Sequence, residues 1–351
     1  MVGRGLLAGL PRLLGERCPA HRYAVISDSR VAELYGARLL AALRDAGLRA
    51  LLFEFPAGEW NKTRETWTEL TDALLAARVG RDGAIVALGG GVTGDLAGFV
   101  AATYLRGIPF VQAPTTLLAM IDASIGGKTG VDVPAGKNLV GAFHQPRCVV
   151  ADIETLATLP KPHVAAGMAE AIKHAVVADA AYLEALLADA AAIRARDLDA
   201  LERVVAHSVA IKEAIVAADP LEGGRRQVLN FGHTIGHAVE ARSGYALRHG
   251  EAVAIGMAAE ALLAEAAGIA EPGLAARVRR ALEAFDLPVT VPEELGADDL
   301  LETMRGDKKS RDATLRFALP ERIGAMPARA AGAWTVAVHE DTILQVLASS
   351  R

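Results

Sequence analysis

Up to about residue 155, short apolar runs alternate with segments in which apolar residues recur at helical spacing. The runs YAVISD (23–28) and RALLFEFP (49–56) are typical of strands, and the segment SRVAELYGARLLAALRDAG between them has helical periodicity that stops at Gly47. Further apolar runs, GAIVALGG, PFVQAPTT and CVVADIETL, follow along the chain and also predict strands. Strands that alternate with helices favour a mostly parallel sheet covered by helices.

After Pro160 the pattern changes to helical periodicity that is nearly continuous. The segments KPHVAAGMAEAIKHAVVADAAYLEALLADAAAIRA and DALERVVAHSVAIKEAIVAAD show it, as does most of 231–285. We therefore predict an α/β N-terminal domain over residues 1–158, with a Rossmann-like, mostly parallel sheet. An all-α C-terminal domain over residues 159–351 is expected to follow it.

Composition narrows the class of protein. The formal net charge is −5 and the basic residues are dispersed, which argues against a nucleic-acid partner and favours small molecules. The two cysteines, Cys18 and Cys148, stand in dissimilar contexts, so a reducing compartment is expected. We find no apolar run of membrane-spanning length and no signal-peptide pattern at the N-terminus. These features predict a cytoplasmic protein without a membrane partner.

A glycine-rich stretch follows the predicted strand at GAIVALGG. Gly89, Gly91 and Gly94 have the spacing G-x-G-x-x-G, with Gly90 between them, and an apolar helical pattern follows. In this context the helix N-terminus and its open amides can receive a pyrophosphate, as in Rossmann-type nucleotide sites. A tight strand–helix turn without a ligand is the alternative. Because this unit is not the first in the chain, earlier elements would hold the adenosine end.

The segment DASIGGKTGVD resembles a P-loop only superficially. The Walker pattern requires glycine where this chain has Asp122. Lys128 nevertheless lies within ten residues of Lys137 and Asn138 in sequence, and such a set suits an anionic group of a substrate. The alternative is a solvated lysine pair in a glycine-rich surface loop.

Three histidines, and three ionisable residues that share one face of another predicted helix, are candidates for a metal site. His233 and His237 are four residues apart on one helical face, and His249 begins the next predicted helix. His233 and His237 could bind a metal together, or His233 and His249 could do so with a carboxylate from a third helix. The second set would leave one coordination position of the metal open, as in catalytic sites. Residue 234 is threonine, so the zinc-protease motif is excluded. Glu170, Lys173 and His174 share one stripe of a third helix, which is either solvent-facing or part of a site.

Several blocks of the sequence together resemble one family. They are GGGVTGDLAGFVAATYLRG, QAPTTLLAMIDASIGGKTGVD, GKNLVGAFHQP, GMAEAIKHAV, RQVLNFGHTIGHAVE, HGEAVAIGM and DKK (307–309). In order and spacing, from about residue 23 to 320, they look like the 3-dehydroquinate synthases of the sugar-phosphate cyclase superfamily. Members convert 3-deoxy-D-arabino-heptulosonate 7-phosphate to 3-dehydroquinate and phosphate in the shikimate pathway, which leads to chorismate and aromatic amino acids.

The resemblance implies cofactors and residue roles. It implies NAD, which is transiently reduced, and a divalent metal, with zinc expected first and cobalt as the alternative. The metal ligands would be Glu170, His233 and His249. Substrate-contacting positions would be Asp122, Lys128, Lys137, Asn138, Lys173, Lys212, Arg226, Asn230, His237 and Lys308, with Arg106 contributed by the partner subunit of a homodimer. NAD contacts would be Asp28, Glu59, Lys62, Gly89, Gly90, Gly91, Gly94, Asp95, Thr115 and Thr116, with Lys128 and Lys137 shared between cofactor and substrate.

Three alternatives remain open at the level of sequence. The first is a sister cyclase, namely an aminodehydroquinate, 2-deoxy-scyllo-inosose or 2-epi-5-epi-valiolone synthase. The second is a metal- and NAD-dependent polyol dehydrogenase that carries out net oxidation. The third is a catalytically inactive binding or scaffold protein, which would need no metal.

Overall fold

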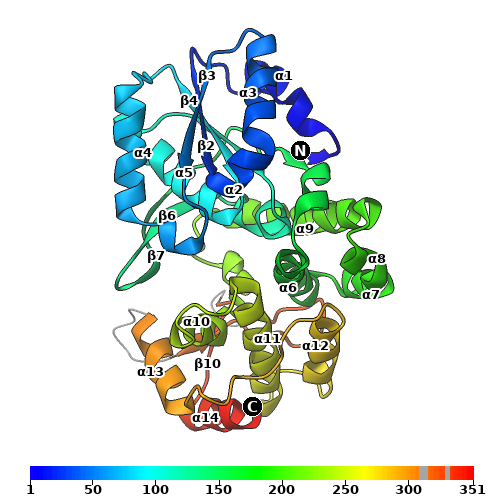
Figure 1. The fold of residues 1–351 in the computed structure, drawn as a ribbon. Coiled ribbons are helices and arrows are strands. Elements are labelled where there is room, and N and C mark those ends of the chain that lie inside the picture. The colour runs from blue at the N-terminus through cyan, green and yellow to red at the C-terminus, as the bar shows by residue number, and fades with distance from the viewer. Residues whose placement is uncertain (308–314, 329–332) are drawn as a thin grey trace. The chain divides into compact units, whose positions relative to one another are not determined.

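The computed structural model describes residues 1–307, 315–328 and 333–351, and the chain divides into two compact units (Figure 1). The first unit comprises Met1–Leu159 and Leu201–Val209, and the second comprises Pro160–Ala200 and Ala210–Arg351. The domain ranges 1–158 and 159–351 remain a prediction.

The first unit is built on a parallel four-stranded sheet of order β3-β2-β4-β5. Its strands are β2 (Tyr23–Asp28), β3 (Ala50–Phe55), β4 (Ala84–Gly89) and β5 (Phe110–Pro114). Every residue of β4 is buried, as expected for a central strand covered on both faces. The prediction of a mostly parallel α/β sheet is confirmed.

Helices cover both faces of this sheet (Figure 1). On one face, helices α1 (Leu6–Arg17) and α3 (Ala37–Asp45) pack against side chains such as Val86. On the other face, α4 (Arg64–Ala76) and α5 (Gly91–Thr103) pack against neighbours that include Ile85. The two faces alternate along each strand because successive side chains point to opposite sides of a sheet.

Short elements complete the first unit. They are β1 (Val2–Gly3), α2 (Ser29–Val31), η1 (Ala32–Gly36), η2 (Glu59–Asn61), η3 (Tyr104–Arg106), η4 (Ala119–Ala123), β6 (Lys128–Val133), β7 (Gly136–Phe143), β8 (Ala151–Asp152) and η5 (Ile153–Thr158). The antiparallel hairpin β6–β7 was not predicted. The run CVVADIETL forms a much shorter strand than expected, because the Asp152 carboxylate accepts the amide of Glu154 and starts a 3-10 turn there.

Among its described residues, the second unit is helical apart from two short strands. Its helices are α6 (Lys161–Ala178), α7 (Ala180–Ala188), α8 (Ala190–Ala195), α9 (Leu198–Ala218, whose middle belongs to the first unit), η6 (Arg225–Asn230), α10 (His233–Arg242), α11 (His249–Ala266), α12 (Leu274–Glu283), α13 (Ala297–Asp307) and α14 (Glu340–Ser349). The strands are β9 (Arg316–Phe317) and β10 (Val336–Ala337), an antiparallel pair that the sequence did not predict. The predicted helical character is confirmed.

Helix α11 forms the centre of the second unit. It packs against α6, α10 and α12, and α6 and α11 are buried over most of their lengths. Two acidic residues of these helices, Glu170 on α6 and Glu260 on α11, are therefore fully buried. None of the helices among the described residues combines the length and apolar character needed to cross a membrane.

Candidate metal and nucleotide sites

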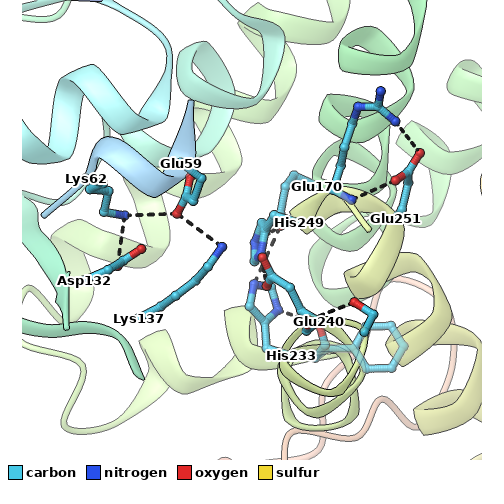
Figure 2. A network of polar contacts seen from close by, with 12 residues as sticks. Glu59, Lys62, Asp132, Lys137, Glu170, His233, Glu240, His249 and Glu251 are labelled. Carbon is cyan, nitrogen blue, oxygen red and sulfur yellow. Dashed lines mark hydrogen bonds and ion pairs between the residues drawn. The ribbon is translucent and has the colours of Figure 1, made fainter. Parts of the chain in front are cut away.

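Three helices of the second unit direct potential metal ligands to one point (Figure 2). Glu170 lies on α6, His233 is the first residue of α10 and His249 is the first residue of α11. Glu170 Oε1 is 3.6 Å from Nε2 of both histidines, and one donor atom from each residue lies within 4.8 Å of the others. A buried carboxylate with two imidazoles is a donor set that fits a divalent cation such as zinc.

Lys173 is buried next to this donor set. Its ammonium group forms an ion pair with the Glu170 carboxylate, and the two residues are 1% and 0% exposed. His174, the third member of the predicted stripe, is also fully buried. The solvent-facing alternative for this stripe is therefore wrong. A buried lysine and glutamate are tolerated because each charge compensates the other.

The two histidines near Glu170 differ in protonation. Burial lowers the pKa of His233, and the Lys173 ammonium lowers it further, so this imidazole is neutral. Burial also lowers the pKa of His249, but the neighbouring Glu170 and Glu240 carboxylates outweigh it and raise the pKa overall. Protonated His249 therefore lies between two carboxylates, and a bound cation would have to displace its proton because a ligating imidazole is neutral.

His237 belongs to the same cluster of imidazoles. Its ring centroid is 5.3 Å from that of His233 and 5.9 Å from that of His249. A second set of close donor atoms comprises His237, Glu240 and His249. The structure therefore brings all three histidines together, and geometry allows more than one pairing.

Glu240 was not singled out from the sequence. Its Oε2 lies 3.2 Å from His249 Nδ1, and the residue is buried on α10. A carboxylate at this distance accepts the Nδ1 proton and leaves Nε2 of His249 directed at Glu170. The signal that could have found it is an acidic residue three positions after His237 within an apolar helix.

The remaining predicted substrate residues of the second unit are buried or engaged nearby. Lys212 on α9 is 6% exposed and Arg226 in η6 is 2% exposed. The Arg226 guanidinium donates to the carbonyl of Pro220 at 2.7 Å, and Asn230 Nδ2 donates to Glu222 Oε1 at 2.9 Å. Lys308 lies outside the described residues.

In the first unit, the glycine stretch forms the turn from β4 into α5. Gly90 is the N-cap of α5 and supplies no side-chain cap, so the first amides of the helix are not capped from within. A Cβ on Gly94 would lie 2.8 Å from Gln112 Oε1, and one on Gly90 would lie 3.1 Å from Thr116 Cγ2. Positions 90 and 94 thus have no room for a side chain. The N-terminus of α5, which no side chain of its N-cap residue caps, suits a phosphate group.

Other predicted nucleotide residues surround this turn. Asp28, at the end of β2, accepts the amides of Arg30 and Val31 with Oδ1, and its Oδ2 accepts the Thr93 hydroxyl of α5 at 3.1 Å. Thr115 follows β5 and donates its amide to the Gly89 carbonyl at 2.9 Å. Thr116 Oγ1 accepts the amide of Ala119. Asp28 and Thr115 therefore lie at the carboxyl edge of the parallel sheet, where open α/β sheets bind ligands.

A charged network joins the remaining residues predicted to contact a nucleotide to the hairpin β6–β7 (Figure 2). Lys62 is 3% exposed, and its Nζ lies 2.8 Å from Asp95, 3.7 Å from Glu59 and 3.9 Å from Asp132. Glu59 also pairs with Lys137 of β7 at 3.2 Å. Burial lowers the pKa of Lys62, but Asp95, Glu59 and Asp132 outweigh it and keep the ammonium charged.

Asp132 was missed in the sequence. Its Oδ1 accepts the amide of Asn138, which has a left-handed backbone with φ of 55°, and its own amide donates to the Lys62 carbonyl. Asp132 thus ties the turn that carries Lys137 and Asn138 to the segment of Lys62. The signal was the acidic residue between the two predicted lysines.

Three more of the predicted residues belong to the first unit. Lys128 is exposed at the start of β6, and Asp122 is half-buried in η4. Arg106 is exposed at the end of η3, with a left-handed backbone of φ 67°.

Comparison with known proteins assigns the chain to a family. The family model described as 3-dehydroquinate synthase N-terminal matches residues 52–166, and the one described as 3-dehydroquinate synthase C-terminal matches residues 167–310. A protein of Symbiobacterium thermophilum named 3-dehydroquinate synthase is 51% identical over 325 residues, which cover 92% of this chain and 91% of that protein.

Solved structures extend the similarity to the whole fold. A 2-deoxy-scyllo-inosose synthase in complex with carbaglucose-6-phosphate, NAD+ and Co2+ superposes with a TM-score of 0.91 at 28% identity, covering 99% of this chain and 96% of that one. A 2-epi-5-epi-valiolone synthase from Streptomyces hygroscopicus subsp. jinggangensis, with NAD+ and Zn2+ bound, gives 0.87 at 31% identity, covering 99% and 95%. Both family models and the extended sequence identity agree, and the chain belongs to the 3-dehydroquinate synthase family.

Proposed function

We propose that this protein is a 3-dehydroquinate synthase that converts 3-deoxy-D-arabino-heptulosonate 7-phosphate to 3-dehydroquinate and inorganic phosphate. The observation that carries the proposal is the donor set of buried Glu170 with half-buried His233 and His249, beside Lys173, in a chain of this family. Such a set, with an open position, is typical of catalytic rather than structural metal sites. The enzyme would be a phosphate-eliminating lyase that acts in the cytoplasm.

The proposed metal ligands are Glu170, His233 and His249, and His237 is assigned to the substrate. Glu170 supports this choice because its Oε1 is equally distant from the two ligand imidazoles, at 3.6 Å, whereas His237 is exposed. The metal is proposed to be zinc, with cobalt as the alternative, since sister cyclases are described with Zn2+ and Co2+. When bound, such an ion polarises a hydroxyl oxygen of the substrate.

The proposed second cofactor is NAD, which accepts a hydride from the substrate and returns it when bound. The uncapped N-terminus of α5, with Gly89, Gly90, Gly91 and Gly94, would hold the pyrophosphate. The other proposed contacts are Asp28, Glu59, Lys62, Asp95, Thr115, Thr116, Lys128 and Lys137. Lys62 fixes Asp95 by an ion pair, so that one carboxylate oxygen of Asp95 is held in place for a cofactor hydroxyl.

The chain's own residues have defined tasks in this reaction. Lys173 compensates the charge of Glu170 and holds its carboxylate in one position. The substrate carries a phosphate dianion and a carboxylate, and cationic side chains lower the energy of both. We assign Asp122, Lys128, Lys137, Asn138, Lys173, Lys212, Arg226, Asn230, His237 and Lys308 to substrate contacts. The departing phosphate can itself take the proton that is lost during elimination, so no strong protein base is required.

Arg106 is proposed to act on the substrate of the partner subunit in a homodimer. Its side chain is exposed, and the backbone at this residue is left-handed. Mixing inactive Arg106→Ala and Lys173→Ala subunits should restore activity, because one site of each mixed dimer then has both residues intact. No recovery after verified subunit exchange would contradict the proposal.

A sister cyclase is the second candidate, because the two solved structures reported above belong to sister cyclases. The test is phosphate release from a panel of substrates. We expect turnover of the heptulosonate phosphate and none of glucose 6-phosphate or sedoheptulose 7-phosphate. The opposite pattern would favour the sister cyclase, and aminodehydroquinate synthesis would require turnover of the amino analogue.

A further inference from the structure

We infer that Glu260 is a positioning residue for the metal site: from α11 it fixes the first turn of α10 and hence the imidazole of His233. The inference rests on the metal site proposed above and extends it to a residue outside the ligand set.

Glu260 caps the helix that carries His233. The residue is completely buried, its Oε2 accepts the amide of Gly232 at 2.7 Å and its Oε1 accepts the amide of Ile235 at 3.0 Å. The N-cap of α10 is Gly232, which has no side chain and a left-handed backbone with φ of 81°. Because the helix start cannot cap itself, the neighbouring helix supplies the acceptors for its open amides.

The same peptide group that Glu260 holds also orients His233. Nδ1 of His233 lies 3.2 Å from the carbonyl oxygen of Phe231, and the amide bonded to Glu260 belongs to the next residue, Gly232. The carbonyl of Phe231 and the amide of Gly232 lie in one planar peptide unit, so fixing one fixes the other. A carbonyl only accepts, so Nδ1 donates and Nε2 is left to face Glu170. Glu260 therefore acts on the proposed ligand through one rigid peptide.

Close packing leaves α10 few other positions. A Cβ on Gly232 would lie 3.0 Å from the Val253 carbonyl oxygen, and one on Gly236 would lie 2.9 Å from that of Ala252. The two helices therefore approach more closely than side chains would allow. Packing sets the distance between α10 and α11. The two hydrogen bonds of Glu260 set the rotation of the first turn of α10.

The arrangement is reciprocal between the two helices. Glu240 on α10 holds Nδ1 of His249, the first residue of α11, while Glu260 on α11 holds the start of α10. Each proposed ligand histidine thus begins one helix and is oriented by a carboxylate of the other. This pattern is expected of groups that orient metal ligands and is not required for helix packing alone.

A purely structural cap is the competing explanation, and the chain contains a matched control for it. Glu265, also on α11, accepts the amide of Ala275 at 2.9 Å at the start of α12, which likewise follows a left-handed glycine, Gly273 with φ of 92°. Glu265 therefore makes a comparable cap on a helix that carries no proposed ligand.

The test compares Glu260→Gln, Glu260→Ala and Glu265→Ala with the unaltered protein. Each metal-free protein is titrated with Co2+ against a competing chelator, the visible Co2+ absorption is recorded, and thermal unfolding is followed without metal. We expect about a tenfold or greater loss of Co2+ affinity and an altered spectrum for both Glu260 variants, in line with the effect of groups that orient ligands. Glu265→Ala should lower the unfolding temperature yet retain the affinity and the spectrum.

Unchanged Co2+ affinity in the two Glu260 variants would overturn the inference, as would an equal loss in Glu265→Ala. Should Glu260→Ala not fold, Glu260→Gln decides alone, because it keeps the shape and one acceptor. A failure of the unaltered protein to bind Co2+ would be recognised before any variant is compared, and it would remove the proposed metal site together with the inference.

Discussion

In each of the two units, a buried charged residue lies among groups of opposite or variable charge, but its charge is compensated differently in the two cases. In the first unit, Lys62 is surrounded by the carboxylates of Asp95, Glu59 and Asp132. In the second unit, Glu170 is surrounded by Lys173 and two imidazoles. The neighbours of Lys62 carry fixed charges near neutral pH, whereas imidazoles can exchange a proton for a metal.

The charged centres around Lys62 and around Glu170 therefore differ in how they respond to pH. The pKa of Lys62 is raised by its carboxylate neighbours despite burial, so the charge of that centre is constant through the neutral range. Around Glu170, the pKa values of His233 and His249 are shifted in opposite directions. On the proposed function, the first centre would be a constant support for the hairpin and the proposed nucleotide residues, and the second would exchange a proton for the proposed metal.

The largest expected effect is the loss of the metal in Glu170→Gln. This change removes the carboxylate shared by both imidazoles, so metal affinity should fall by more than the roughly 10–100-fold typical of residues that only orient ligands. The metal that stays bound after dialysis is measured by elemental analysis.

The ligand assignment is tested by two histidine variants. His249→Ala should also lose the metal, whereas His237→Ala should keep the metal and fail in turnover. Equal metal loss in the two histidine variants would contradict the ligand assignment.

The next largest effect is on stability, in Lys62→Met. Removing the ammonium leaves three carboxylates close together, and the loss of one partner of a buried pair should lower the free energy of unfolding by about 3 kcal/mol. Urea unfolding measures it. The control is Arg12→Met, which removes an exposed pair with Glu16 and should cost less than about 0.5 kcal/mol. Similar values for the two variants would show that the Lys62 network does not support the fold.

A smaller effect is the pH dependence of metal binding. Since the pKa of His249 is raised in the metal-free protein, binding must release its proton, and affinity should rise about tenfold per pH unit through the neutral range. His233, with its lowered pKa, is already neutral and adds nothing to this slope. The stabilisation that the protonated His249 gives the metal-free protein is present below its unfolded pKa and is lost as pH rises through its folded pKa. An affinity that does not change with pH would contradict this assignment.

The smallest effect is expected for Asp132→Asn. Burial raises the pKa of Asp132 by more than Lys62 lowers it, so the negative charge there is not strongly stabilised. Asparagine keeps an oxygen for the amide of Asn138, and the free energy of unfolding should change by less than about 1 kcal/mol. A loss as large as that of Lys62→Met would mean that the charge at residue 132 is essential.

Regular patterns in the sequence predicted the parallel sheet and the helical second unit. Alternating apolar runs predicted the parallel strands, and helical periodicity predicted the second unit, because period and burial are linked directly. The hairpin Lys128–Phe143 was missed, since its many glycines and polar residues give no clear alternation. The strand at Ala151–Asp152 was overestimated because a side-chain cap ended it.

The site was less accessible to sequence reasoning. Spacing placed His233 and His237 on one face but could not select the pair that would hold a metal with Glu170, and the resemblance to a family supplied that assignment. Glu240, Glu260 and Asp132 were not predicted because their roles depend on contacts between segments far apart in the chain. No local pattern distinguishes a buried carboxylate that orients a ligand from one on a solvated helix face.

On the proposed function, the enzyme oxidises and then reduces its substrate within one turnover, and an assay with limiting NAD distinguishes this from net oxidation. Metal-loaded protein is supplied with excess heptulosonate phosphate and a much smaller amount of NAD, and both phosphate and NADH are followed. We predict release of phosphate and dehydroquinate in large molar excess over NAD, with no accumulation of NADH. Accumulation of NADH in step with product, or no phosphate release, would contradict the proposed function.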